Sequence, residues 1–143
     1  MEFTVKEQII EIVHKLFIYT DNQEWKKLQK EVFSELVDFD MSSLGGEISK
    51  KSSIDICNEW KQGFEGIDSI NHLAGNHLVK ISNNSAEVFI YATATHFKES
   101  AIKGKTREFV GSYNLHLVKN MKRWKIDKFK YNLKYMTGNL DLK

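Results

Sequence analysis

Residues 87–98 read EVFIYATATHFK, and this stretch decides the fold class because both of its faces are apolar when the chain is extended. Side chains of a β-strand point alternately to opposite faces. One face would carry Val88, Ile90, Ala92, Ala94 and His96. The other would carry Phe89, Tyr91, Thr93, Thr95 and Phe97. The pattern predicts a β-strand with neither face polar enough to lie in water.

Similar stretches flank this strand along the chain. Residues 71–82 precede it across the turn signal Asn83-Asn84-Ser85, and residues 108–119 and 124–135 follow, joined by a turn over 120–123. Apolar alternation bounded by turn residues is typical of β-hairpins. We therefore expect an antiparallel meander after Gly66.

Before Gly66 the apolar residues recur at helical spacing. A first helix is expected over residues 4–20, with Thr4 as N-cap and Glu7 as its capping-box partner. Asp21-Asn22 ends that helix. The further expected elements are a short helix over 24–32, a short strand over 36–41, a loop over 43–51 and a third helix over 53–64. This order predicts a single α+β domain over residues 1–143, in which the helices cover one face of a curved antiparallel sheet.

The second face of the sheet then lacks a cover. Helices from a chain this short reach only one face, and the apolar side chains of the other face need a partner. We expect a homo-oligomer, a dimer or a trimer, that packs through this outer sheet face.

Composition bounds the class of protein. The 143 residues are 41% hydrophobic, enough for one globular domain with a full core. The lone Cys57 excludes an internal disulfide. Charged residues interrupt the first apolar stretch, so we expect no signal peptide, no membrane span and a cytoplasmic location.

The charges are unevenly spread along the chain. Residues 1–97 hold 9 basic and 15 acidic groups, and residues 98–143 hold 12 basic and 4 acidic groups, for a net charge of +2 overall. The basic stretch would suit a phosphate-bearing partner. However, Lys128, Lys130 and Lys134 alternate with apolar residues as on a solvated strand face, so neither a nucleic-acid nor a membrane partner is expected.

A few residues could carry chemistry. Asp21 lies at the helix break, His72 and His77 lie near the start of the sheet, and His96 ends a run of small residues. Small side chains on the face of His96 leave space, as at the floor of a pocket. The alternatives are a structural histidine at position 96 and a helix-capping aspartate at position 21.

Other site types are disfavoured by spacing. His72 and His77 fall on opposite faces of an unbroken strand, although a bulge at Gly75 would change this, and no metal site is expected. Cys57 lies on an apolar helix stripe, where a small buried side chain is the ordinary role. The chain has no glycine-rich phosphate loop, and nothing in it resembles a Walker or dinucleotide-binding motif.

Several short motifs together resemble a known family. These are Tyr19-Thr20-Asp21-Asn22-Gln23-Glu24-Trp25, Ser69-Ile70-Asn71-His72-Leu73, Ala94-Thr95-His96, Gly111-Ser112-Tyr113-Asn114-Leu115-His116, Arg123-Trp124-Lys125-Ile126 and Gly138-Asn139. In this order they resemble the SnoaL-like group of the nuclear transport factor 2-like superfamily, with scytalone dehydratase as the most similar chemistry. The resemblance implies a cone-shaped, cystatin-like α+β barrel around a deep pocket, and catalysis without a cofactor.

The resemblance also implies a set of site residues. Asp21, His72 and His96 would be catalytic, and the substrate would contact Tyr19, Met41, Trp60, Ser112 and Asn114. Where scytalone dehydratase has pocket tyrosines, this chain has Thr20 and Met41.

If the pocket is catalytic, these residues suit general acid and base chemistry at neutral pH. His96 would take a proton beside a carbonyl, His72 would protonate the departing hydroxyl, and Asn114 would hold the oxygen on which charge accumulates. The expected function is a dehydratase, isomerase or cyclase acting on a cyclic or polyketide-like ketone. A non-catalytic small-molecule binding domain and a filled, purely structural domain remain as alternatives.

Overall fold

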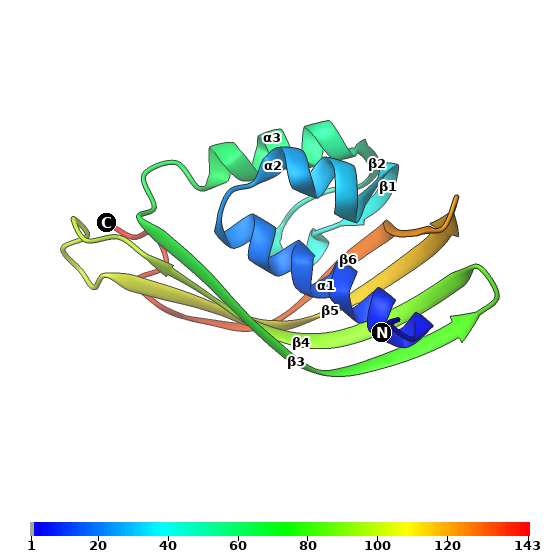
Figure 1. Ribbon diagram of the computed structural model, residues 1–143. Coiled ribbons are helices and arrows are strands. Elements are labelled where there is room, and N and C mark those ends of the chain that lie inside the picture. The colour runs from blue at the N-terminus through cyan, green and yellow to red at the C-terminus, as the bar shows by residue number, and fades with distance from the viewer. Residues whose placement is uncertain (1) are drawn as a thin grey trace.

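The computed structural model describes residues 2–143 as helices packed on one side of a long curved sheet (Figure 1). The helical elements are α1 (Val5–Asp21), α2 (Trp25–Lys27), the π-helical turn η1 (Leu28–Val32), the 3₁₀ turn η2 (Ser42–Leu44) and α3 (Ser53–Gly63). The strands are β1 (Phe33–Asp40), β2 (Ile48–Ser52), β3 (Ser69–Ser82), β4 (Ser85–Phe97), β5 (Thr106–Asn120) and β6 (Arg123–Gly138). The α+β class and the four long strands predicted from the sequence are confirmed.

The first helix begins and ends where its sequence predicts. The Thr4 hydroxyl accepts the Glu7 backbone N–H at 3.1 Å, and the Glu7 carboxylate accepts the Thr4 backbone N–H at 2.8 Å. This capping box satisfies two N–H groups that lack partners within the helix. Ile9, Val13 and Leu16 on one face of α1 are buried against the sheet, and the helix carries Asp21 at its last turn.

The sheet is six-stranded, in the order β2-β1-β6-β5-β4-β3. The β3–β4, β4–β5 and β5–β6 pairs are antiparallel, as the turn signals predict. Pairing is irregular between Gly75 and Leu78 in β3 and at two places along the β5–β6 pair. Such bulges bend a strand and increase its twist, consistent with the curvature of the sheet over the helices.

Two sequence-based expectations about the first half of the chain are wrong. Residues 48–52 form edge strand β2 instead of a loop, and β1 joins the sheet parallel to β6, so the sheet is mixed. An edge strand with one partner and a half-exposed, lysine-rich sequence has little apolar alternation to detect. The segment 28–32 is a π-helical turn within the expected second helix.

The core lies between the helices and the inner sheet face. α1 and α3 contribute Ile9, Val13, Leu16, Ile56 and Cys57, and the strands contribute Val37, Val88, Ile90, Leu115, Leu117 and Ile126. These side chains are almost fully buried. Among the described residues, no helix is both long enough and apolar enough to span a membrane.

Candidate active site

A pocket of about 190 Å³ opens between the helices and the inner sheet face. Its walls are mostly aromatic and include Phe17 from α1, Trp60 from α3, Phe64 just after α3, Phe109 from β5 and Phe129 from β6. The polar side chains of its lining are Thr20, His72, His96, Tyr113 and Tyr131. A few polar groups in an apolar hollow are typical of small-molecule sites.

Asp21 and His72 form a tight pair at one wall of this pocket. The Nδ1 atom of His72 lies 2.5 Å from Oδ1 of Asp21, and the His72 backbone N–H donates to Oδ2 at 3.0 Å. The side chain of His72 is only 9% exposed and that of Asp21 is 16% exposed. Phe17 stacks on the imidazole with ring centroids 5.4 Å apart. Because a carboxylate accepts hydrogen bonds, the neutral form of the His72 imidazole carries its proton on Nδ1 and its lone pair on Nε2.

His96 has the opposite arrangement of donor and acceptor. Nε of Arg107 donates to its Nδ1 at 3.1 Å. Arginine only donates, so Nδ1 is unprotonated and the neutral imidazole carries its proton on Nε2. Burial, then the positive charge of Arg107 and the neighbouring His72, lower the pKa of His96 to about 4, against an opposing effect of Asp21. The imidazole is therefore a neutral hydrogen-bond donor at neutral pH.

Two tyrosines that sequence reasoning missed form part of the pocket floor. Tyr113 and Tyr131 pair across β5 and β6, with ring centroids 4.9 Å apart. Burial raises the pKa of Tyr131 to about 12 and also raises the pKa of Tyr113, so both stay neutral. The Tyr131 hydroxyl is buried and has no hydrogen-bond partner among residues 2–143. In the sequence, Tyr113 falls on the same strand face as the apolar residues Phe109 and Leu115. This alternation indicates that Tyr113 faces the interior of the protein.

Gly111 lies next to the two tyrosines, at a position where only a residue without a Cβ atom fits. A Cβ atom at that position would lie 2.6 Å from the Tyr131 hydroxyl oxygen and 2.3 Å from the Asn132 carbonyl oxygen. Both distances are far below van der Waals contact. The glycine thus permits the close packing of β5 against the Tyr131 ring.

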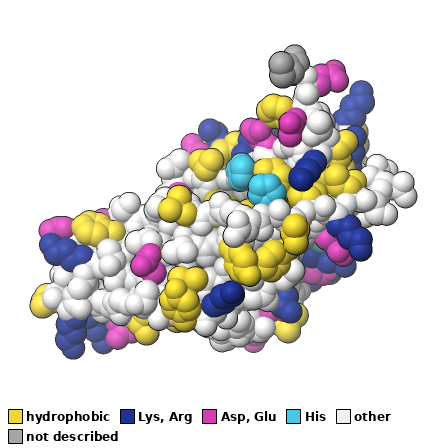
Figure 2. Space-filling model, turned by 90° about the horizontal axis from the view of Figure 1, so that it is seen from below, with side chains coloured by type: hydrophobic (Ala, Val, Ile, Leu, Met, Phe, Trp, Pro, Cys, Tyr) yellow, Lys and Arg dark blue, Asp and Glu magenta, His cyan; other side chains and the backbone are white. Residues whose placement is uncertain are grey.

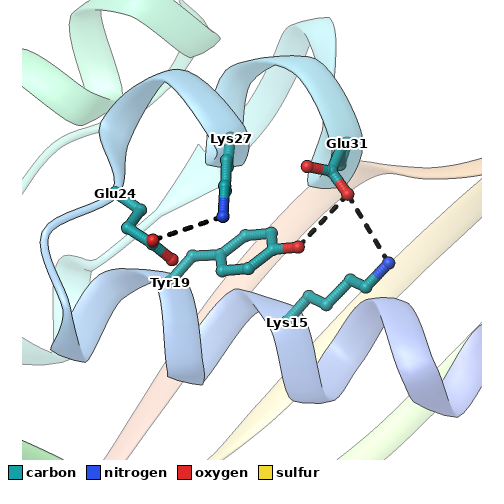
Figure 3. Close-up of polar contacts among 5 residues, drawn as sticks. All are labelled: Lys15, Tyr19, Glu24, Lys27 and Glu31. Carbon is teal, nitrogen blue, oxygen red and sulfur yellow. Dashed lines mark hydrogen bonds and ion pairs between the residues drawn. The ribbon is translucent and has the colours of Figure 1, made fainter.

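The structure brings together five of the eight residues named from the sequence. His72 and His96 line the pocket and Asp21 supports His72, while Met41 and Trp60 are wall residues. Tyr19 lies elsewhere: its hydroxyl donates to Glu31 at 3.2 Å, on the side of α1 that faces η1 (Figure 3). Tyr19 precedes the pocket residue Thr20 by one position, which rotates it by about 100° around the helix.

The expectation that Ser112 and Asn114 face the pocket is also wrong. Both lie on the outer sheet face, where the Asn132 side-chain amide donates to Asn114 at 2.7 Å and to Ser112 at 3.3 Å. Tyr113 and Leu115 are buried on the inner face. Side chains alternate along a strand, so when Tyr113 faces inward, its neighbours Ser112 and Asn114 face outward.

The remaining histidines do not assemble a metal centre. A bulge does follow Gly75, and His77 lies beside His14 of α1, with ring centroids 6.5 Å apart. No group of three or more metal-ligating side chains occurs among residues 2–143. Burial raises the pKa of Cys57 to about 11, which suits a packing residue and not a nucleophile.

A larger and more open hollow, about 870 Å³, lies on the outer sheet face. Lysines and carboxylates such as Lys80, Glu87, Lys128 and Asp38 line it. His116 also lines it and its Nδ1 lies 2.6 Å from Oδ1 of Asp127, but both of these side chains are 24% exposed. Figure 2 views the molecule from this side and shows apolar patches among charged side chains. The smaller inner pocket is the better candidate site because its imidazoles are desolvated and held in place.

Comparisons with known proteins agree with this architecture. A protein of Kribbella flavida has a TM-score of 0.88 at 20% identity, with 96% of this chain and 95% of that chain covered. A putative scytalone dehydratase of Novosphingobium aromaticivorans has a TM-score of 0.80 at 14% identity, covering 92% and 85%. Hexachlorocyclohexane dehydrochlorinase LinA-type3 of Novosphingobium barchaimii has a TM-score of 0.74 at 12% identity, covering 94% and 89%.

At these identities the structural likeness shows the fold, which is that of the NTF2-like superfamily. No curated protein sequence matches the chain. The model of the SnoaL-like domain matches residues 1–130, nearly the whole chain. The protein therefore belongs to the SnoaL-like domain family.

Proposed function

We propose that the protein is a cofactor-independent acid/base enzyme that eliminates water from a small cyclic β-hydroxy ketone. The observation that carries this proposal is the Asp21–His72 pair, which leaves a lone pair on Nε2 of an imidazole at the wall of an apolar pocket. The names of two structural neighbours, a putative dehydratase and a dehydrochlorinase, also denote eliminations.

The hydrogen bonds favour a different division of roles from the one expected from the sequence, because they make His72 the base in place of His96. His72 is the base: its Nε2 takes the proton from the carbon beside the carbonyl, and Asp21 stabilises the resulting imidazolium. His96 is buried and neutral, and its Nε2–H donates a hydrogen bond to the carbonyl oxygen as negative charge develops there.

The elimination is then completed by His72. The carbon–carbon double bond forms as the C–O bond to the hydroxyl breaks, and the imidazolium returns its proton to the departing oxygen, giving water and a free enzyme. The same groups would catalyse a double-bond isomerisation if the proton returned to another carbon.

The size of the pocket limits the substrate class. A cavity of about 150 Å³ lined by aliphatic and aromatic side chains binds benzene in an engineered protein. The pocket here, at about 190 Å³ with mostly aromatic walls, therefore suits a single six-membered ring with small substituents. Neutral oxygens on that ring would meet the neutral donors of His96 and the two tyrosines.

The test is a panel of monocyclic β-hydroxy ketones followed by the ultraviolet absorption of the enone product. We expect turnover that His72→Gln lowers by about 10²- to 10⁴-fold. His77→Gln, which removes an exposed histidine from the same strand, is the matched control. If ligands bind with an increase in Tm but are recovered unaltered, the protein is a small-molecule binding domain and the enzymatic proposal fails.

Exposed apolar side chains on the outer sheet face favour a second copy of this chain as a partner. Leu73 and Leu78 are more than 70% exposed there, beside the partly exposed Tyr91. Contiguous exposed apolar side chains on a sheet are typical of an interface. We propose a homo-oligomer through this face.

A further inference from the structure

Arg107 lies outside the pocket lining and contacts the pocket residue His96 directly. It lies on β5 opposite His96 of β4, and its Nε donates to Nδ1 of His96 at 3.1 Å. One terminal nitrogen donates to the Leu140 carbonyl at 2.8 Å, and the guanidinium lies 5.4 Å from the centroid of the Phe109 ring. Three contacts in different directions fix the guanidinium plane.

This fixed donor determines what His96 offers to a ligand. A neutral imidazole in an apolar site has two tautomers, and the environment of one nitrogen selects the proton position on the other. Since Arg107 has no acceptor atom, it is compatible only with an unprotonated Nδ1. The Nε2 atom, the other ring nitrogen, must then carry the proton.

We propose that Arg107 is a positioning residue that holds His96 as its neutral Nε2–H tautomer, and that the Leu140 carbonyl of the C-terminal segment holds Arg107 in turn. Arg107 thereby makes His96 a donor to a carbonyl or hydroxyl oxygen of the substrate and leaves His72 as the single base. This inference deepens the proposed function and rests on it for its catalytic consequence, but the tautomer itself is testable without a substrate.

The charged and titratable groups around His96 come from three elements. Arg107 approaches from β5, His72 from β3 and Asp21 from α1, while the rings of Phe64 and Phe109 lie against the imidazole. Burial, then Arg107 and His72, disfavour protonation of His96, and Asp21 favours it. Removing the arginine charge would therefore raise the pKa of His96 above about 4.

A lysine cannot reproduce the contact. Its ammonium lies at the end of a flexible stem, whereas Nε of arginine is held within a planar group that also reaches Leu140. The Arg107→Lys variant keeps the charge and loses the geometry. The Arg107→Met variant loses both and keeps the apolar stem.

The decisive experiment is ¹⁵N NMR of the histidine ring nitrogens as a function of pH. In the unmodified protein we expect His96 with a protonated Nε2 and an unprotonated Nδ1 from pH 5 to pH 8. In Arg107→Met we expect a mixture of tautomers and protonation at higher pH. The exposed His77 in the same spectra is an internal reference, and Arg123→Met, on the β5–β6 hairpin, is the matched control.

Activity provides the second readout. Turnover should fall by about tenfold or more in Arg107→Met and remain reduced in Arg107→Lys, while KM changes less. A protonated Nδ1 on His96 in the unmodified protein, or an unchanged tautomer in a folded Arg107→Met, overturns the proposal. If Arg107→Met does not fold, the Arg107→Lys spectrum and the spectrum of the unmodified protein decide. If the tautomer of His96 changes in the Arg107 variants but the unmodified protein turns over no substrate, the proposed function fails and the positioning role of Arg107 stands.

Discussion

Asp21 holds His72 at two points, because one carboxylate oxygen contacts the ring Nδ1 at 2.5 Å and the other accepts the backbone N–H of the same residue at 3.0 Å. The second contact ties the end of α1 to the start of edge strand β3. The pair is thus a structural clamp as well as a candidate catalytic dyad, and its two roles are separable by mutation.

Asp21→Asn should separate them. The amide oxygen still accepts one N–H, so the fold should persist with a loss of about 1–2 kcal/mol in the free energy of unfolding. The amide stabilises an imidazolium poorly, so turnover should fall by about 10²-fold or more. Urea unfolding and steady-state kinetics on the same preparations measure the two effects. Equal activity in a folded Asp21→Asn contradicts the catalytic role of the pair.

The stability of the protein should depend on pH through His96. Its pKa is about 4 in the folded state and about 6.5 in the unfolded chain, so the unfolded state binds the proton first as pH falls. The contribution is fully present above pH 6.5 and is lost between pH 6.5 and pH 4, at most about 3 kcal/mol over that window.

A variant isolates that contribution from the acid destabilisation by carboxylates. His96→Gln cannot titrate, so between pH 6.5 and pH 4 its free energy of unfolding should decline less steeply than that of the unmodified protein. Urea unfolding at five pH values across the window measures the difference. Parallel curves for the two proteins exclude a buried neutral His96.

The Tyr131 hydroxyl should contribute nothing favourable to folding without a ligand. It is buried and unpartnered among the described residues, and an unsatisfied buried hydroxyl costs about 1–3 kcal/mol. Tyr131→Phe should therefore equal or exceed the unmodified protein in stability, with Tyr135→Phe at the exposed end of the same strand as the control. A clear drop in the denaturation midpoint of Tyr131→Phe would show that the hydroxyl has an internal partner.

Gly111→Ala should have the opposite effect. Its Cβ would lie 2.3 Å from the Asn132 carbonyl oxygen, a backbone atom of the paired strand that cannot move without disturbing the β5–β6 ladder. Overpacking of this kind typically costs about 1–3 kcal/mol. Gly75→Ala, in a strand position where a Cβ meets nothing within 4 Å, is the control and should be near neutral. Thermal unfolding of both variants tests the comparison, and a stable Gly111→Ala would refute the close packing.

The fold was predictable where burial is periodic in the sequence. The capping box of Thr4 and Glu7 and the alternation in 87–98 are local signals, and the structure confirms the elements that they predict. Strand β2 escaped prediction because it is a short edge strand whose pairing with β1 depends on residues far from it in sequence.

The residues of the site could be predicted only in part. The histidines stand out by residue type, but which face of β5 is inner depends on packing of the whole sheet, so Ser112 and Asn114 were assigned to the wrong face. Nothing in the sequence near Arg107 indicates its contact with His96, because that contact arises from the register of β4 against β5. The charge state of His96, and therefore its role, follows only from that register.

The outer sheet face yields the last prediction. Leu73 and Leu78 are 71% and 72% exposed on this face, and their burial between two copies would stabilise an assembly by about 25 cal/mol for each Å² of apolar surface removed from water. Leu78→Glu would place a charge in that interface and should shift the light-scattering mass toward 16.7 kDa. Ile102→Glu is the matched control, since Ile102 is 92% exposed but lies on the loop between β4 and β5, away from the sheet face. A mass of one chain for the unmodified protein, or an equal effect of both substitutions, would count against assembly through the sheet.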